Sequence, residues 1–411
     1  MTGTGCKGPL DGLRVLDLSK VLAGPWSTQI LGDLGAEVIK VELPGVGDET
    51  RRWGPPFLDD GSGDAAYYLA TNRNKRGISI NLAHEGGASL IRQLVVQADI
   101  LVENFKVGAL ARYGLDYASL SALKPDLIYC SITGFGQDGP HAHRGGYDFL
   151  VQGMSGLMSV TGFPDDQGGA PTKVGIPVSD LFTGLYATIA ILAAVNHRTH
   201  TGEGQHIDCA LLDTQLSLLA NQASNYLNGG MVPGRLANEH PNVVPYQDFA
   251  TADGHVLVAV GTDKQFRDFC VLIGLDDLGT DPRFATNSGR STHRRALQAL
   301  MGPAIQQWTS QDLLGAMQAR GLPGGPVNSI PDALADPQVA ARDLIQTLDR
   351  DGQSIRSLAF PARLSKSPAT YRQAPPVRGA DTAAVLREYL GLSDDEIGAL
   401  ARQGILEDTL Q

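Results

Sequence analysis

Asp180 stands directly in front of a long uncharged stretch. The segment KVGIPVSDLFTGLYATIAILAAV spans residues 173–195, and the fifteen residues from Leu181 to Val195 carry no charge. The order PVSD before an apolar run predicts a helix start, with Ser179 or Asp180 near the N-cap. In one interpretation the carboxylate only caps the helix. In the other it is a nucleophile, because a helix N-terminus favours the ionised form and the apolar helix behind it keeps the site dry.

Two further segments carry groups suited to an anionic or nucleotide ligand. The segment NRNKR supplies Arg73, Lys75 and Arg76 just before a predicted strand, and such cations bind phosphate oxygens. A solvated basic turn explains the same pattern equally well. In VENF, at the end of another predicted strand, Asn104 is placed to hydrogen-bond a base edge or an amide, and Phe105 to stack on a ring.

The remaining motifs limit the chemistry. Tyr147 and Asp148 in GGYDFL follow a glycine-rich basic segment, where a loop closing onto a helix explains them without any catalytic role. His197, His200 and His206 lack the regular spacing to a carboxylate or cysteine that a metal site needs, so we expect no metal. No GxSxG elbow is present, and SKVLAGPW after the first strand lacks the glycine spacing of a dinucleotide site.

Short apolar runs alternate with helical patterns over the first third of the chain. This alternation predicts an α/β fold in which helices cover both faces of a parallel sheet. Ligands in such folds bind beyond the carboxyl ends of the strands. The predicted strands are 13–18, 37–42, 77–82, 100–105 and 127–132, and the predicted helices are about 25–35, 86–98 and 117–123.

The length of 411 residues and local changes in composition predict two domains. Residues 225–245 are rich in Gly, Pro and Asn, which is typical of a linker or an active-site loop. The following YQDFATADGHVLVAVG predicts a hairpin, and helical patterns continue from about 264 to 320. We therefore expect a large domain formed by residues 1–224 and 331–411, and a small domain with its linker at 225–330.

The bulk composition is that of a globular protein, with 42% hydrophobic and 19% charged residues. A net charge of −11 argues against a nucleic-acid partner but is compatible with a local basic site. Cys6, Cys130, Cys209 and Cys270 form no CxxC pair, which predicts reduced thiols in a cytoplasmic protein. The N-terminal residues lack a signal-peptide core, and the run after Asp180 is short for a membrane span, so we expect no membrane association.

Across nearly the whole chain, these segments resemble the class III CoA-transferases, the CaiB/BaiF family. The resemblance implies a Rossmann-like large domain built from both chain ends, a smaller α+β domain, and a homodimer of two interlocked subunits. It also implies that acyl-CoA and small carboxylic acids are the substrates. The collinear segments that carry it are LDGLRVLDLSKVLAGP, LGDLGAEVIKVE, GDETR, NRNKRGISINL, ADILVENFKVGALARYGL, SITGFGQDGP, GYD, SGLMSVTG, SDLFTGLYA, TGEGQHIDCALLD and GPVNS.

By this resemblance, Asp180 occupies the position of the family's catalytic aspartate. The carboxylate there attacks the thioester carbonyl of a donor acyl-CoA to give a mixed anhydride, and the released CoA thiolate converts this to an aspartyl-CoA thioester. An incoming carboxylic acid repeats the steps in reverse and leaves as the new acyl-CoA. A covalent intermediate divides one difficult exchange into easier steps, and an apolar helix that excludes water protects it from hydrolysis.

Other residues acquire roles from the resemblance by their positions. Val21, Leu22 and Ala23 match the family segment beside the thioester end of CoA. Tyr147 and Asp148 match an active-site pair near the nucleophile. The residues that match segments holding the adenine and phosphates are Arg73, Lys75, Arg76, Asn104, Phe105 and Arg112.

Two rivals share the expected fold. An α-methylacyl-CoA racemase or epimerase needs two acid–base groups, which that branch supplies as a histidine in a GHD motif and the aspartate. Here the motif is GYD, and an unperturbed tyrosine such as Tyr147, with a pKa of about 10, is a poor base near neutrality. A catalytically silent CoA-binding protein is disfavoured because Asp180 stands at the nucleophile position.

The substrate branch is suggested by YCSITGFGQDGP, GYD, SGLM and VPYQDF, which resemble the enzymes that use succinyl-CoA and a dicarboxylate such as glutarate or hydroxymethylglutarate. Malate, itaconate, mesaconate, aromatic acids and carnitine-type acceptors stay open. Formyl and oxalyl chemistry is disfavoured, since HPNVVPYQ stands where formyl-CoA transferases have a glycine-rich flap. A distal carboxylate needs a cation, and the candidates are Arg144, Arg235 and His240, with Arg235 preferred.

Overall fold

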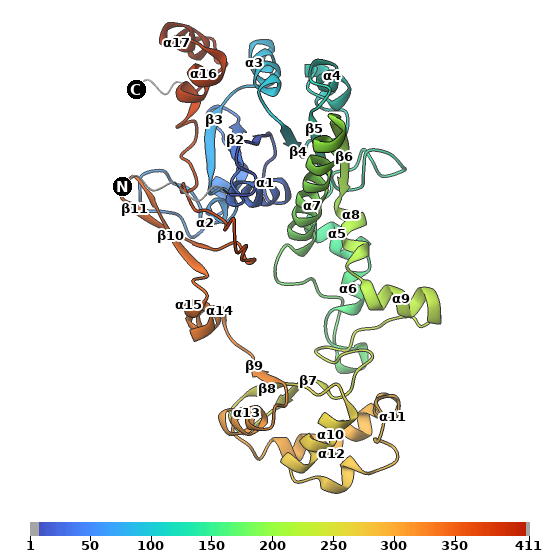
Figure 1. Cartoon of the computed structure of the whole chain (residues 1–411). Helices are drawn as coiled ribbons and strands as arrows, with labels where there is room; N and C mark the ends of the chain where they lie inside the picture. Colours follow the sequence, from blue (N-terminus) through green and yellow to red (C-terminus); the bar gives the residue numbers. More distant parts are fainter. Residues whose placement is uncertain (1–7, 408–411) are drawn as a thin grey trace. The chain divides into compact units, whose positions relative to one another are not determined.

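The structure, a computed structural model, describes residues 8–407 and divides the chain into two units (Figure 1). The smaller unit consists of Met158–Lys173 and Asn228–Val339, and the larger unit contains the other described residues. The predicted boundaries at 224/225 and 330/331 lie slightly before those of the structure. Nothing in the sequence pattern indicates that residues 158–173 belong to the smaller unit. Cys6 lies outside the described residues.

A parallel sheet forms the centre of the larger unit. Its strand order among the described residues is β3-β2-β1-β4-β5-β6, the reversal of order lying between β1 and β4. The predicted strands are all present, the third beginning two residues earlier than expected, and β6 is an addition. The strands are β1 (Arg14–Asp17), β2 (Glu37–Glu42), β3 (Lys75–Ser79), β4 (Ile100–Glu103), β5 (Ile128–Thr133) and β6 (Gln205–Ala210).

Side chains alternate across this sheet and feed two hydrophobic cores. Val15 packs into one core and its neighbour Leu16 into the other, and Val38 and Ile39 divide in the same way. This two-sided burial is what a parallel sheet covered by helices on both faces requires. The α/β class expected from the sequence is therefore confirmed.

The helices of the larger unit cover both faces of the sheet. One core includes residues of α3, α4, α16 and α17, and the other includes residues of α1, α5 and α7. The C-terminal α16 packs against α3 and β3, so the end of the chain returns to the sheet formed by its beginning (Figure 1). The helices of the whole chain are α1 (Ala23–Asp33), α2 (Ala66–Leu69), α3 (Glu85–Val96), α4 (Tyr117–Leu123), α5 (Asp148–Met154), α6 (Leu157–Val160), α7 (Val178–Thr201), α8 (Leu211–Ser217), α9 (Ala220–Gly229), α10 (Asp263–Leu272), α11 (Asn287–Thr292), α12 (Arg294–Ile305), α13 (Ser310–Ala319), α14 (Ile330–Ala335), α15 (Pro337–Ala341), α16 (Thr382–Leu390) and α17 (Asp394–Arg402).

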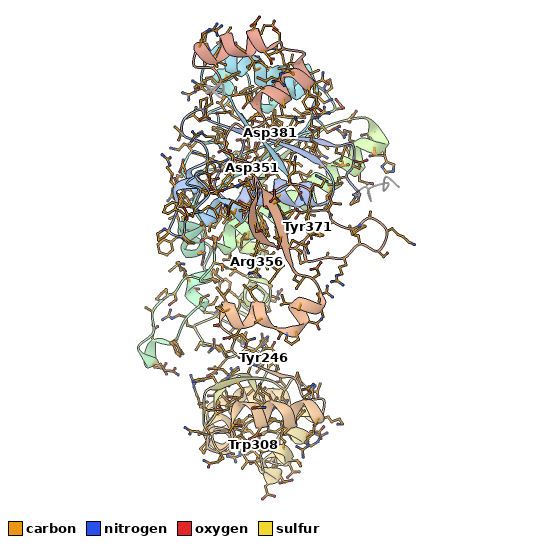
Figure 2. All side chains as sticks on the ribbon, turned by 90° about the vertical axis from the view of Figure 1, so that its left-hand side faces the viewer. Tyr246, Trp308, Asp351, Arg356, Tyr371 and Asp381 are labelled. Carbon is orange, nitrogen blue, oxygen red and sulfur yellow. The ribbon has the colours of Figure 1, made fainter. Side chains whose placement is uncertain are left out.

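The smaller unit has its own antiparallel sheet and core. The predicted hairpin is present as β7 (Tyr246–Ala250) and β8 (His255–Ala259), and β9 (Gly324–Pro326) adds to its edge. Figure 2 labels Tyr246 and Trp308 in this unit. A second hairpin, β10 (Ile345–Arg350) with β11 (Gln353–Leu358), belongs to the larger unit and has no counterpart in the predicted elements.

The long helix α7 is buried on one face only. Small and polar side chains such as Ser179, Gly184 and Ala187 face the protein, whereas Phe182 and Ile189 are exposed. By length and composition α7 is apolar enough to cross a membrane, and 39% of its most apolar window is buried. The expectation of a helix buried in protein therefore holds for one face, and the other face is an unpartnered apolar surface in the chain taken by itself.

Candidate active site

Asp180 lies in the first turn of α7 but does not cap it. The N-cap is Pro177, which has no capping side chain, and Asp148 performs the capping role instead. Its Oδ1 accepts the Ser179 amide at 2.8 Å, while its Oδ2 accepts Gln152 Nε2 at 2.7 Å. The interpretation of Asp180 as a plain capping carboxylate is therefore wrong, and its oxygens have no hydrogen-bond partner recorded among the described residues.

The surroundings of Asp180 disfavour its charge. Desolvation, followed by the nearby negative charge of Asp148, raises the pKa of Asp180 to about 7. A carboxyl group with such a pKa is both more basic than an ordinary aspartate and still ionised in part near neutrality. That combination is typical of groups that take part in chemistry, since ordinary surface carboxylates are not perturbed in this way.

Tyr67 on α2 lies within electrostatic reach of Asp180, a neighbour that no motif indicated. Burial, and then the charges of Asp180, Asp148 and Asp48, raises its pKa to about 12. The phenol thus stays protonated and keeps an O–H to donate. Its ring meets that of Trp53 edge-on, with centroids 5.4 Å apart, which fixes its orientation. The only sequence feature that could have drawn attention to Tyr67 is the pair of tyrosines in AYYL, just before NRNKR.

The helices α1 and α7 cross very closely one turn after Asp180. A Cβ added to Gly184 would stand 2.6 Å from the carbonyl oxygen of Ala23, so only glycine permits the approach. Ser27 and Thr188 hydrogen-bond across the same contact at 3.0 Å. The crossing brings the predicted segment Val21, Leu22 and Ala23 alongside the first turns of α7. The side chains of Leu22 and Ala23 are buried, so the backbone is what they can offer a substrate.

A cavity of about 300 Å³ lies beyond the carboxyl ends of β1 to β4, where ligands of this fold class bind. The predicted residues Phe105 and Arg112 both line it. Arg112 lies 4.5 Å from the centroid of the Tyr113 ring and has no ion pair among the described residues, so it is available to phosphate. Other lining residues are apolar (Leu43, Val46, Ile80, Leu82) or charged (Lys20, Lys40, Asp48). Lys20 is paired with Glu49 and Lys40 with Asp48, so Arg112 is the lining cation that has no ion pair among the described residues. An apolar wall with one such cation suits an adenine nucleotide such as that of CoA.

The three cations of NRNKR do not reach this cavity. Arg73 pairs with Asp33 at 2.6 Å and Lys75 with Asp17 at 3.1 Å, and both cations are almost completely buried. Arg76 pairs with Glu37 and with Glu388 of α16. The expectation that these cations hold phosphates is corrected, because their charges are already neutralised by carboxylates. Residue types alone do not show such pairing.

Asn104 lies between cavity-lining residues and binds the backbone of one of them, Lys20. Its Oδ1 accepts the Lys20 amide at 2.9 Å, and its Nδ2 donates to the Lys20 carbonyl at 2.7 Å. Both ends of the side-chain amide are therefore occupied by the backbone of the β1–α1 turn. Asn104 therefore supports the wall of the cavity, and since one N–H of its side-chain amide is not used by these bonds, contact with adenine stays a prediction.

The candidate residues for a distal carboxylate lie in different units. Arg144 belongs to the larger unit, is exposed, and has no ion pair among the described residues. Arg235 belongs to the smaller unit, where it donates to the Phe163 carbonyl and pairs with Asp165. Burial and the positive charge of Arg294 lower the pKa of His240, so its ring is neutral near pH 7. This shift weakens the prediction that His240 binds a carboxylate as a cation.

Tyr147 is the exposed residue of its pair. Its side chain is 71% exposed, and it stands at the N-cap of α5 without a capping hydrogen bond.

Of the histidines weighed as metal ligands, His206 hydrogen-bonds Ser131 at 2.9 Å and stacks on Tyr117, and His200 hydrogen-bonds the Asn196 carbonyl. These partners give the two histidines structural roles.

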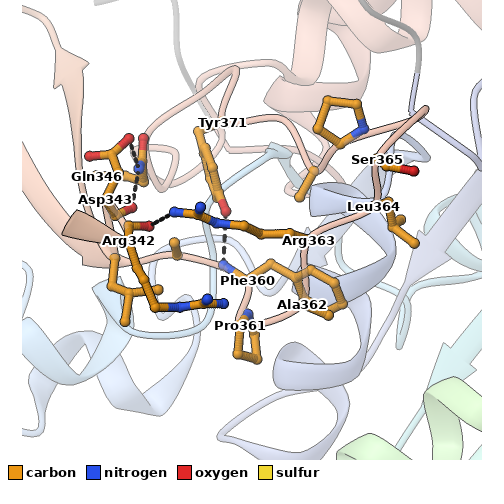
Figure 3. Close-up of a pocket in the computed structure, with 14 residues that line it drawn as sticks. Arg342, Asp343, Gln346, Phe360, Pro361, Ala362, Arg363, Leu364, Ser365 and Tyr371 are labelled. Carbon is orange, nitrogen blue, oxygen red and sulfur yellow. Dashed lines mark hydrogen bonds between the residues drawn. The ribbon is translucent and has the colours of Figure 1, made fainter. Parts of the chain in front are cut away.

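A second cavity, of about 410 Å³, contains none of the predicted site residues. It lies in the C-terminal part of the larger unit, between Arg342 and Tyr371 in the chain (Figure 3). The Phe360 amide donates to the Tyr371 hydroxyl at 2.9 Å, and Arg363 donates to the Arg342 carbonyl. Because none of the residues expected to bind CoA lines this second cavity, the cavity beside β1–β4 remains the candidate CoA site.

A parallel sheet with a cavity beyond its strand ends, and a desolvated aspartate in the first turn of a helix, fits an enzyme that binds acyl-CoA and uses a carboxylate nucleophile. A family model described as CoA-transferase family III matches residues 10–382. The chain belongs to this family and is a CoA-transferase.

Proteins with similar sequences and structures match this chain over almost its full length. Succinate–glutarate CoA-transferase of Agrobacterium fabrum is 50% identical over 386 residues, which cover 93% of this chain and 96% of that protein. Succinyl-CoA:glutarate CoA-transferase of Mus musculus is 40% identical, covering 97% and 90% of the two chains. A crystal structure of a CAIB/BAIF family protein from Brucella suis has a TM-score of 0.83 at 48% identity, covering 93% and 100%. These names favour CoA transfer over the racemase alternative.

Proposed function

We propose that this enzyme moves CoA from succinyl-CoA to a dicarboxylate such as glutarate, through an aspartyl-CoA thioester on Asp180. The observation that carries the proposal is Asp180 itself, a desolvated carboxyl group with a pKa of about 7 beside the α1–α7 crossing. The names of the two similar CoA-transferases supply the donor and acceptor class.

The chemistry proceeds by carbonyl substitution, with no net gain or loss of protons. An Asp180 oxygen attacks the thioester carbon of succinyl-CoA, the C–S bond breaks, and CoA thiolate leaves a mixed anhydride. The thiolate attacks the Asp180 carbonyl and releases succinate, which leaves the aspartyl-CoA thioester. The acceptor carboxylate then attacks this thioester to form a new anhydride and free thiolate. Attack of the thiolate on the acceptor acyl carbon gives the new acyl-CoA and restores the Asp180 carboxylate.

Neighbouring residues support these steps in different ways. The phenol O–H of Tyr67 is a donor for the oxyanion that develops at each tetrahedral stage. Asp148 caps α7 and so fixes the helix turn that carries the nucleophile. The closely packed α1–α7 crossing excludes water, which protects the anhydride and the thioester from hydrolysis. The cavity beside β1–β4 would hold the adenine and phosphates of CoA, where Phe105 and Arg112 would contact them.

We further propose that Arg144 recognises the distal carboxylate of the acceptor. The sequence preference for Arg235 is weakened because Asp165 already neutralises that guanidinium. Arg144 lies three residues before Tyr147 in the loop that leads into α5, and it has no carboxylate partner among the described residues. A planar guanidinium with free N–H groups is suited to bind a carboxylate in a bidentate manner.

We also propose an interlocked homodimer in the cytoplasm. The exposed apolar face of α7 supports the dimer, since large apolar patches are uncommon on monomeric proteins. The buried free thiols Cys130, Cys209 and Cys270 support a reducing location.

The test combines turnover with intact mass. The purified protein is incubated with succinyl-CoA and a panel of mono- and dicarboxylic acids, and new acyl-CoAs are identified. We expect glutaryl-CoA from glutarate, and a covalent CoA adduct on the wild-type protein. Both should disappear in Asp180→Ala and persist in Asp166→Ala, an exposed aspartate of the smaller unit. Loss of stereochemistry in a 2-methylacyl-CoA without any transfer would overturn the proposal.

A further inference from the structure

Val21 adopts a backbone conformation that its side chain disfavours. Its φ is +71°, in the left-handed region where β-branched residues are genuine outliers. Such a conformation persists only where the surroundings hold it, and it is found most often at functional sites. Val21 lies in the turn between β1 and α1, immediately before the residues that meet Gly184 of α7.

Two side chains from other segments of the larger unit hold this turn. Asn104 binds both the amide and the carbonyl of Lys20, as described above. Asp48 accepts the Val21 amide itself, at 3.3 Å to Oδ1 and 3.2 Å to Oδ2. The conformation of Val21 is thus imposed by tertiary contacts rather than by its own preference.

Asp48 is rigidly fixed in its turn. Its Oδ2 accepts Lys40 Nζ at 3.0 Å, and its Oδ1 accepts the amide and hydroxyl of Thr50. The side chains of Asp48 and Lys40 are fully buried, and Lys40 also donates to the Ser19 carbonyl at 3.0 Å. Both residues line the candidate nucleotide cavity. The same buried ion pair therefore forms part of the cavity wall and of the support for the strained turn.

We propose that Asp48 is a positioning residue for CoA transfer, which holds the Val21 turn in its left-handed form so that the α1 N-terminus lies correctly beside Asp180. The inference rests on the proposed function of Asp180. Asp48 does not touch the reacting atoms in this role. It acts through Val21, and a displacement of about 1 Å at a reacting centre can cost about a hundredfold in rate.

A double-mutant cycle tests the proposal. Asn at position 48 would retain one acceptor oxygen but present an amide N–H where the Val21 amide and Lys40 need acceptors. We therefore expect Asp48→Asn to lower kcat by about ten- to a hundredfold while the KM for acyl-CoA changes much less. Glycine adopts φ near +70° without strain. In the Val21→Gly background the turn needs less support, so Asp48→Asn should lower kcat severalfold less than it does in the wild type.

The outcomes separate a positioning role from a structural one. If Asp48 only neutralises Lys40, the losses from Asp48→Asn and Val21→Gly will simply multiply, and the proposal is overturned. Where Asp48→Asn fails to fold by circular dichroism, the same cycle is run with Asn104→Ala, which removes the neighbouring support and leaves the ion pair intact. An inactive wild-type protein would refute the proposed function and this inference together, whereas an active wild type with independent effects would refute the inference alone.

Discussion

A carboxylate that acts as a nucleophile needs its negative charge, and the surroundings of Asp180 oppose that charge. Desolvation and Asp148 together bring its pKa to about 7, where basicity and ionised fraction are balanced near neutral pH. Asp148 has a second role, because it also caps the helix turn that carries Asp180. One residue thus couples the position of the nucleophile to its ionisation.

The pH dependence of transfer follows from this arrangement. Because the pKa of Asp180 is raised to about 7, its carboxyl group becomes protonated as the pH falls below that value, and the protonated form is not a nucleophile. We expect kcat/KM to fall about tenfold per pH unit below that value. Asp148→Asn removes the like charge and should move this acid limb to lower pH. In the control variant Asp166→Asn the acid limb should stay where it is in the wild type. If it also stays there in Asp148→Asn, Asp148 does not raise the pKa of Asp180.

Acceptor selectivity provides a second test at the level of single residues. If Arg144 binds the distal carboxylate, Arg144→Ala should raise the KM for glutarate about tenfold or more and leave a monocarboxylate nearly unchanged, since a charged hydrogen bond contributes about 1.5–3 kcal/mol. Arg235→Ala is the matched control, because its guanidinium is paired with Asp165. A selective effect in Arg235→Ala instead would restore the preference drawn from the sequence.

At the level of elements, patterns of hydrophobicity predicted more than patterns of charge. The buried strands were readable because parallel strands are continuous apolar runs. The edge strand β6 was missed because QHIDCA begins with two polar residues and contains no continuous apolar run. The sequence also indicated Asp180 and the lining residues Phe105 and Arg112. It could not show that Arg73 and Lys75 are neutralised by carboxylates far away in the chain, since pairing depends on the fold and not on residue type.

The α1–α7 crossing gives a prediction for an element contact. Gly184→Ala would bring a Cβ to 2.6 Å from the Ala23 carbonyl, so the helices must separate. Overpacking of this kind typically costs about 1–3 kcal/mol, and we expect a lower thermal midpoint together with reduced transfer. Gly302→Ala on α12 is the control, because nothing lies within 4 Å of its added Cβ. Equal midpoints for the two variants would show that the crossing tolerates a side chain.

For the whole molecule, Glu103 at the end of β4 links stability to pH. Burial raises its pKa to about 7, although Ser131 and the Phe105 amide hydrogen-bond it. A carboxyl group with a raised folded-state pKa stabilises the protein fully below its unfolded value of about 4.5, and that stability is lost as pH rises through about 7. Glu103→Gln should therefore gain stability relative to the wild type between pH 5 and pH 8, by up to about 3 kcal/mol. The check is the thermal midpoint at both pH values, with exposed Glu85→Gln as control. A constant difference between Glu103→Gln and the wild type would contradict it.

The exposed face of α7 concerns the assembly. Phe182, Leu185, Tyr186 and Ile189 are between 36% and 60% exposed along one side of a helix whose other side bears the active site's supports. Water contact with so much apolar surface is unfavourable, at about 25 cal/mol per Å². A second copy of the chain that covers this face would remove the cost and would also complete the dry surroundings that the aspartyl intermediates need.

Ile189→Glu tests this arrangement directly. A charge buried at an interface is strongly unfavourable unless it is paired. If two copies meet at this face, as we propose, the variant should shift the protein from twice the 43.5 kDa mass of one chain towards the mass of the monomer. Light scattering coupled to gel filtration gives the mass, and transfer activity is measured on the same fractions. Leu123→Glu, on an exposed position of α4, should leave both unchanged. If Ile189→Glu stays dimeric, the partner does not cover α7. If it becomes monomeric but retains full activity, the dimer is not needed to keep water from Asp180.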